Sequence, residues 1–301
     1  RAEALAPNAY STAEARISVG VAHDRPPADW LPRAEADLAR PPSQQEAFSY
    51  ANAKSTAGMT LLQVGRTADA ALYVQSAYDN DPITRVNRYY MPFTRAAAGL
   101  YGAKEGFDEA LSRTVSGYHW EIATVAAVFM DAGDPEAVFK RVPEDTETFV
   151  PCYRDLAAAL KAKDAKTRLA GAKRADVCLT MFDSPHVNIV AQAALGDLDR
   201  AFAIADRPDL TQLFWNYFPT LFLPPNRPMR ADPRFLPLME KLRYVDYWKR
   251  SNTKPDVCGT LEELEIPRPA LNLEVGTAPH GAMTGRIMEA VEKQLMKERP
   301  D

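Results

Sequence analysis

The chain has 301 residues, of which 46% are hydrophobic and 25% charged, and 36 Lys and Arg residues nearly balance 40 Asp and Glu residues, for a net charge of −4. This composition is typical of a globular protein and excludes a wholly disordered chain. The longest apolar runs, such as Ile122 to Met130, are far shorter than the roughly 20 residues that cross a bilayer, so no membrane span is predicted. Basic residues are scattered among carboxylates, which argues against direct nucleic-acid binding.

In two pairs within the first 41 residues, an alanine is followed five positions later by a proline. Ala2 with Pro7 and Ala36 with Pro41 have the same separation, and the two pairs lie one repeat length of about 34 residues apart. The chain begins at Arg1, without Met and without the pattern of a signal peptide. We therefore expect a fragment whose first pair closes a repeat that starts upstream.

The segment from residue 51 to 84 gives the clearest repeat signal. Seven of its positions carry the small, apolar, glycine and proline residues of a helix–turn–helix unit of about 34 residues: Gly58, Leu61, Gly65, Ala70, Val74, Ala77 and Pro82. Small residues let two antiparallel helices approach closely, Gly65 ends the first helix, and Pro82 cannot continue the second. The segment resembles a tetratricopeptide repeat, although Lys54 stands where that family usually has Trp.

Further helices are predicted beyond this repeat. Gly106 to Leu111 and Gly196 to Ala201 each resemble the start of a second repeat helix, and Asp134 with Pro135 predicts an N-cap and a first-turn proline. Helical spacing and good helix formers occupy the ranges 120–132, 153–163, 166–177 and 187–195. No useful strand pattern precedes residue 250. The predicted fold is all-α, a superhelical array of antiparallel helical hairpins stacked as a solenoid.

The C-terminal third has a different residue pattern from the repeat region. Residues 214–222 predict an aromatic helix that the Pro224-Pro225 pair ends, and residues 232–242 predict a short helix. Past Ser251 several prolines make the chain irregular, and the apolar face of residues 284–297 predicts a closing helix. We therefore predict a helical repeat domain with a C-terminal cap over residues 1–250 and an irregular tail over residues 251–301.

The cap carries a second resemblance. The run from Met229 to Phe235, the Tyr247-Trp248 pair and the ending Pro255-Asp256-Val257-Cys258 are similar to the C-terminal signature of a bacterial family. In that family, tetratricopeptide-like arrays follow a winged-helix DNA-binding domain or a nucleotide cyclase domain. The resemblance implies a sensory or docking module that regulates an attached output domain. The terminal repeat of an array has no neighbour to cover its last helix pair. Apolar and aromatic side chains such as Phe235, Leu238, Tyr247 and Trp248 suit that role.

Cysteine and histidine usage restricts the chemistry. Three cysteines, at positions 152, 178 and 258, have no zinc-type spacing, and they are either buried thiols or, for Cys152 and Cys178, a bridge across a helical hairpin. The four histidines, at positions 23, 119, 186 and 280, are far apart, so no metal site is predicted. No nucleophile elbow and no phosphate-binding loop occurs. The sequence predicts no cofactor and no catalytic residues.

The predicted binding surface is the concave groove lined by first helices. The residues expected to line it or to anchor a partner are Asn52, Ser55, Met59, Arg88, Tyr89, Arg95, Trp120 and Trp215. Amide, guanidinium and aromatic groups suit an extended protein segment or peptide, or a small polar ligand. The aromatic residues admit a second interpretation, in which they belong to the core.

Three hypotheses about function follow. The first is a non-enzymatic regulatory module of a bacterial signalling or transcription regulator. The second is a free-standing adaptor in a protein complex, and the third is an unfamiliar all-α enzyme that would use residues such as His119 or Asp183. The expected compartment is the cytoplasm, or the periplasm if a membrane segment precedes Arg1. Oligomeric state is left open.

Overall fold

A computed structural model describes residues 10–22, 26–43, 46–113, 117–141, 149–181, 184–207 and 220–256. Every regular element in these ranges is a helix, which confirms the all-α prediction. The elements are α2 (Tyr10–Ala22), α3 (Pro27–Leu38), α4 (Ala47–Gln63), α5 (Thr67–Asn80), α6 (Arg85–Ala97), α7 (Ala103–Arg113), α8 (Gly117–Phe129), α9 (Pro135–Phe139), α10 (Val150–Lys161), α11 (Ala165–Met181), α12 (Pro185–Leu195), α13 (Leu198–Ala205), the 3-10 helix η3 (Pro224–Asn226), α15 (Arg227–Arg230), α16 (Phe235–Lys241) and α17 (Tyr244–Ser251).

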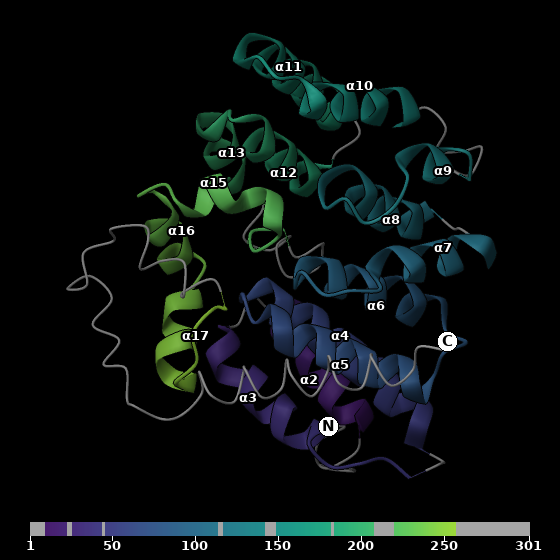
Figure 1. Ribbon diagram of the computed structural model, residues 1–301. Coiled ribbons are helices and arrows are strands. Elements are labelled where there is room, and N and C mark those ends of the chain that lie inside the picture. Colours follow the sequence, from purple (N-terminus) through teal and green to yellow (C-terminus); the bar gives the residue numbers. More distant parts are fainter. Residues whose placement is uncertain are drawn as a thin grey trace.

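Helices that follow one another in the sequence pack as pairs. The pairs are α2 with α3, α4 with α5, α6 with α7, α10 with α11, and α12 with α13. Successive pairs also contact one another, from α2 and α4 at one end to α10 and α11 at the other (Figure 1). The chain then turns back through α12, α15 and α16, so that α17 lies against α3.

The repeat predicted over residues 51–84 forms the α4–α5 hairpin. Gly65 has a φ of +85°, which an L side chain rarely adopts, and it ends α4. A Cβ atom on Gly58 would lie 2.5 Å from Val74 Cγ2 and 3.1 Å from the Ala70 carbonyl oxygen. Only a glycine lets α4 and α5 approach this closely. The steric interpretation of the repeat positions is therefore confirmed for this hairpin.

Most other predicted helices are present within a few residues of their expected bounds. Asp134 caps α9 by accepting a hydrogen bond from the Glu136 amide over 3.1 Å, as the sequence predicts. Pro237 lies in the first turn of α16, where a missing N–H has no cost. Of the helix predicted over residues 214–222, only residues 220–222 are described. The helix predicted over residues 284–297 lies outside the described residues.

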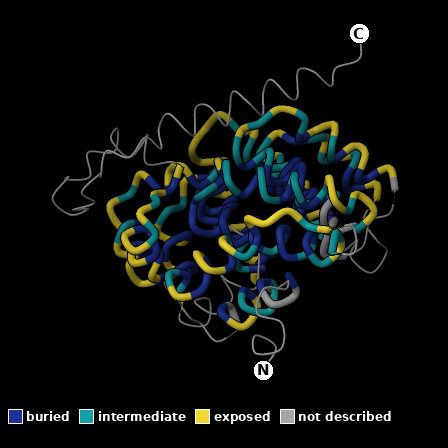
Figure 2. Tube along the Cα trace, turned by 90° about the horizontal axis from the view of Figure 1, so that it is seen from below, coloured by how far each residue is buried: buried dark blue, intermediate teal, exposed yellow. Residues whose placement is uncertain are grey.

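The core runs through the middle of the stack, with exposed segments at its edge (Figure 2). Many of its members are alanines, so large aromatic side chains fill the remaining space. In the C-terminal part, Phe222 packs edge-on against Phe235 and Trp248, with ring centroids 5.9 and 6.1 Å apart. Phe235, Leu238, Tyr247 and Trp248 are all buried.

The C-terminal cap also makes contacts far from the end of the array. Tyr247 and Trp248 were expected to shield the last seam of the array, but they pack near the turn between α4 and α5. The Trp248 indole Nε1 donates to the Val64 carbonyl oxygen over 2.8 Å. Besides the packing of Trp248 with Phe222 and Tyr244, these two helix residues thus join the end of the described chain to one of its first hairpins, a contact that the sequence did not predict.

Residues 252–256, which the sequence assigned to the tail, remain attached to the helical part. The Asp256 amide donates to the Gly65 carbonyl oxygen over 2.9 Å, and Pro255 lies so close to Gly65 that a Cβ there would approach it to 2.6 Å. The predicted boundary between residues 250 and 251 falls inside α17.

Two further sequence questions have structural answers. Cys152 and Cys178 form a disulfide with their Cα atoms 6.1 Å apart, so the bridge rather than a pair of free thiols is present. Within the part of the chain that the structure describes, no helix has the length and apolar character needed to cross a membrane.

Candidate functional site

Three of the predicted groove residues keep partly accessible polar groups, and all three bind within the chain. Asn52 Nδ2 donates to Glu14 over 2.7 Å, which links α4 to α2. Arg95 Nη2 donates to the Gln75 side chain over 2.7 Å, and Arg88 donates to the Ile83 carbonyl oxygen. These contacts stabilise neighbouring helices, and a ligand would have to compete with them.

Four other predicted groove residues are buried: Ser55, Met59, Tyr89 and Trp120. The Tyr89 hydroxyl donates to the Ala110 carbonyl oxygen over 3.3 Å. Trp120 packs edge-on against Phe149 and Tyr153, with ring centroids 5.7 and 5.5 Å apart. Both contacts are those of a helix–helix core, so the groove assignment is revised for these four residues. Trp215 lies outside the described residues.

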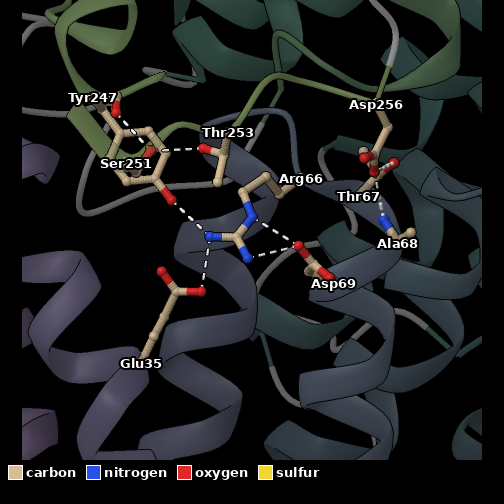
Figure 3. A network of polar contacts seen from close by, with 9 residues as sticks. All are labelled: Glu35, Arg66, Thr67, Ala68, Asp69, Tyr247, Ser251, Thr253 and Asp256. Carbon is tan, nitrogen blue, oxygen red and sulfur yellow. Dashed lines mark hydrogen bonds and ion pairs between the residues drawn. The ribbon is translucent and has the colours of Figure 1, made fainter. Parts of the chain in front are cut away.

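A polar cluster that the sequence analysis missed surrounds Arg66, in the turn between α4 and α5 (Figure 3). The guanidinium forms an ion pair with Glu35 of α3 at 2.7 Å, and its Nε donates to Asp69 over 2.7 Å. Its Nη1 also donates to the Tyr247 hydroxyl over 2.8 Å. Arg66 thus connects α3, α5 and α17. We call Glu35, Arg66, Asp69, Tyr247 and Asp256 the closing junction.

Burial sets the protonation behaviour of the carboxyl group opposite Arg66. Removal from water raises the pKa of Glu35 above its ordinary value, and the charge and hydrogen bond of Arg66 oppose that rise. The pair is partly exposed, with 13% of the Arg66 side chain and 18% of the Glu35 side chain accessible. Loss of Arg66 would leave the largely buried carboxylate of Glu35 without its ion-pair partner, whereas loss of Glu35 would leave Arg66 paired with Asp69.

Asp256 caps α5 from a distant part of the sequence. Arg66 occupies the N-cap position of α5 and its side chain makes no cap hydrogen bond. Asp256 Oδ2 instead accepts hydrogen bonds from the Ala68 amide over 2.7 Å and from the Thr67 hydroxyl over 2.8 Å (Figure 3). Burial raises the pKa of Asp256, and the two hydrogen bonds oppose the rise. The Asp256 carboxylate thus acts as the N-cap of α5, although Asp256 is the last residue of the described chain.

Lys54 lies buried beside the closing junction. Its Nζ lies 3.7 Å from the ring centroid of Tyr73 and 5.5 Å from that of Tyr50, a cation–π arrangement. Burial lowers the pKa of Lys54 to about 8, and the negative charge of Glu35 opposes the change. The two tyrosine rings therefore compensate in part for the water that the buried amine has lost.

Within the described ranges, no three His, Cys, Asp or Glu side chains converge as metal ligands. Among the histidines, His186 lies 3.6 Å from Glu121, and the side chains of His23, His119 and His280 lie outside the described residues, as does Asp183. The sequence signal for the closing junction is weak: α5 has no Ser, Thr, Asp or Asn at its N-cap, which leaves its first amides open to water or to an acceptor from elsewhere in the chain.

Comparison with known proteins adds little to this description. No model of a protein family matches the chain, and no solved structure matches it. A stretch of 40 residues is 48% identical to the UDP-N-acetylglucosamine 2-epimerase of Methanocaldococcus jannaschii and, to the same degree, to an epimerase and an epimerase homolog of Methanococcus maripaludis. The stretch covers 13% of this chain and 11% of each relative, so the chain spans about a tenth of the relatives it matches.

Proposed function

We propose that the chain is a non-enzymatic regulatory module, a tetratricopeptide-like solenoid that binds a protein or peptide partner. In a bacterial signalling or transcription regulator it would pass the bound state to an attached output domain. The observation that carries the proposal is the α4–α5 hairpin, whose Gly58 packs against Ala70 and Val74 as the repeat requires. Repetition of packed pairs from α2 to α13 supports a stack of such units.

An exposed apolar surface available to a partner lies at one end of the α4–α5 hairpin. Phe48 near the start of α4 and Ile83 beyond the end of α5 are 66% and 79% exposed, and the antiparallel arrangement of the helices brings these ends together. Arg88 donates to Ile83 and adds a positive charge at the same end. Exposed apolar side chains beside a guanidinium suit a partner with an apolar anchor and an acidic group.

The compartment proposal uses the disulfide. Of the two compartments that the sequence left open, the Cys152–Cys178 bridge supports the periplasm over the cytoplasm, because disulfides persist under oxidising conditions. We propose no cofactor. The likeness to UDP-N-acetylglucosamine 2-epimerase covers too short a stretch for that activity to be proposed here.

The test is to isolate the native protein from its source and to determine its mass, its N-terminal sequence and its cross-linked partners. An attached output domain supports the regulator, whereas a mature chain that starts near Arg1 with a stoichiometric partner supports the adaptor. Substitution of both Phe48 and Ile83 by Ser should abolish the cross-links. Tyr101→Ser is the matched control, because Tyr101 is 81% exposed but follows α6, at the opposite end of the helices. A protein without added domain or partner would end the proposal.

A further inference from the structure

The Cys152–Cys178 disulfide lies at the surface of the α10–α11 hairpin, which forms the end of the stack farthest from α17 (Figure 1). The two sulfur-bearing residues line a shallow, open depression together with Lys173, Arg174 and Met181. Cys152 is buried, whereas Cys178 is partly exposed. A reagent that enters the depression therefore reaches the sulfur of Cys178 first.

The surroundings of the disulfide are positively charged. Residues 161–181 contain six Lys and Arg residues and two Asp residues, a net charge of +4 in a chain whose total is −4. Lys173 and Arg174 are exposed beside the disulfide, and the nearest carboxylate to Arg174 is that of Asp155, with a separation of 4.0 Å between nitrogen and oxygen. An exposed pair at this distance leaves most of the guanidinium charge available to an incoming anion.

The two sulfur atoms differ as leaving groups. Cys152 is the third residue of α10, within the first turn, whereas Cys178 lies near the C-terminal end of α11. Amide groups at the start of a helix stabilise a thiolate, and carbonyl groups at the end of a helix do not. Attack on Cys178 that expels the thiolate of Cys152 is therefore favoured by access, and the amides at the start of α10 offset the cost of burying the leaving thiolate.

We propose that this disulfide is a thiol-exchange site for a small thiol that carries carboxylates. The incoming thiolate forms a bond to Cys178 Sγ, the bond between the two cysteine sulfurs breaks, and its electron pair stays on Cys152 as the thiolate. The product is a mixed disulfide on Cys178. Lys173 and Arg174 attract the carboxylates of the thiol, and Val177 and Met181, which are 64% and 75% exposed, form the apolar side of the site.

The two helices of this hairpin also make apolar contacts that do not involve the disulfide. Gly171 approaches Ala159 so closely that a Cβ on the glycine would lie 2.2 Å from the alanine Cβ. Leu156 of α10 and Leu179 of α11 are buried. Exchange at Cys178 thus changes a covalent link without removing the apolar contacts between the two helices.

The first experiment uses the oxidised chain and reduced glutathione, a thiol with two carboxylates. After acid quenching and alkylation, peptide mass mapping shows which cysteine carries glutathione and which carries the alkyl group. We expect glutathione on Cys178 and the alkyl group on Cys152. Glutathione on Cys152, or a disulfide that opens only in denaturant, would overturn the proposal.

The second experiment tests the charge requirement by comparing glutathione with the neutral thiol 2-mercaptoethanol. Reversal of both charges in K173E/R174E should slow exchange with glutathione about fivefold more than exchange with mercaptoethanol, as expected for two exposed charges. The matched control K161E/K163E has the same net charge but lies at the other end of the hairpin, about 13 Å along α10 from Cys152. It should change the ratio of the two rates less than twofold.

The charge requirement can also be tested without substitutions, by changing the salt concentration, in case a variant folds poorly. Raising the ionic strength from about 0.01 M to about 1 M shortens the screening length from about 30 Å to about 3 Å. Exchange with glutathione should then slow relative to exchange with mercaptoethanol on the unmodified chain. Equal responses of the two thiols to salt, or to K173E/R174E, would exclude electrostatic selection of an anionic thiol.

Discussion

The α4–α5 and α10–α11 hairpins pack their helices in the same way but are stabilised by different additional contacts. Both rely on a glycine where two helices meet, Gly58 against Val74 and Gly171 against Ala159. Helices α4 and α11 both have 17 residues, yet twelve are buried in α4 and four in α11. The α4–α5 hairpin has neighbours around it, including the C-terminal return, whereas the α10–α11 hairpin lies at the far end of the stack.

The difference indicates that each hairpin has a second source of stability besides the packing between its own two helices. In α4–α5 that source is tertiary, through the closing junction and the Trp248 contact. In α10–α11 it is covalent, through the disulfide. Substitutions that remove each source separately should therefore destabilise different parts of the molecule.

The largest effect is expected for Trp248→Ala. The substitution removes a buried aromatic side chain and leaves the Val64 carbonyl oxygen without its indole donor, and such truncations cost about 3 to 5 kcal/mol. Urea denaturation should show the loss, and hydrogen exchange should show faster opening of α4 and α5. Trp248→Phe keeps a ring but not the N–H and should cost less. Unchanged exchange in α4 and α5 would mean that the C-terminal return does not support this hairpin.

Removal of the disulfide should have the next largest effect, confined to the other hairpin. In the chain-entropy model, a bridge with a sequence separation of 26 residues contributes about 3.5 kcal/mol. Replacing both Cys152 and Cys178 by Ser should speed hydrogen exchange in α10 and α11 and leave α4 and α5 unchanged. Equal acceleration in both hairpins would contradict the separation of the two regions.

Lys54→Met should stabilise the protein at neutral pH by about 1 to 2 kcal/mol, because it removes a buried charge without a paired carboxylate and fills similar volume. The folded-state pKa of Lys54 is lowered to about 8 from an unfolded value of 10.5. The unfolded state therefore binds more protons between these two pH values, and stability rises with pH across that window by about 3 kcal/mol.

The pH dependence gives the control for this substitution. Denaturation at pH 7 and at pH 10 should show the rise in the native chain and its absence in Lys54→Met. Lys249→Met removes a lysine that is exposed on α17 and should keep the rise. A rise of the same size in Lys54→Met would show that another group titrates.

The smallest effect is expected at the distant cap. Asp256→Ala removes the acceptor for the Ala68 amide and the Thr67 hydroxyl and should cost about 1 kcal/mol, the usual value of an N-cap. Because burial raises the pKa of Asp256, its charge is not fully compensated, and the neutral acceptor in Asp256→Asn should cost less than Asp256→Ala. Equal losses for the two variants in thermal denaturation would show that the charge itself is required.

The sequence predicts the helices well because their determinants are local. The cap at Asp134, the turn at Gly65 and the close approach at Gly58 each depend on residues within one hairpin, so spacing alone identifies them. The closing junction depends on pairs that no local pattern reports. Arg66 and Tyr247 are 181 residues apart, and Thr67 and Asp256 are 189 residues apart.

The candidate groove was predicted less well for a related reason. Repeat positions identify the face of a helix on which Ser55 and Met59 lie, but they do not report what covers that face. In this molecule neighbouring helices bury both side chains. Lys54 carried a usable signal, since a lysine in place of a large aromatic residue in a seam requires compensating contacts, here the rings of Tyr50 and Tyr73.

The return of the chain to its first hairpins has a consequence for synthesis. Helix α5 receives its cap only when Asp256 has left the ribosome, 188 residues after Ala68. At about 5 to 20 residues per second, α5 waits for about 10 to 40 seconds with an open N-terminus. A nascent chain that stalls before residue 222 lacks Phe222, Trp248 and Pro255 and therefore presents the turn at Gly65 uncovered, so any protein that handles the growing chain meets a surface that the finished molecule does not have.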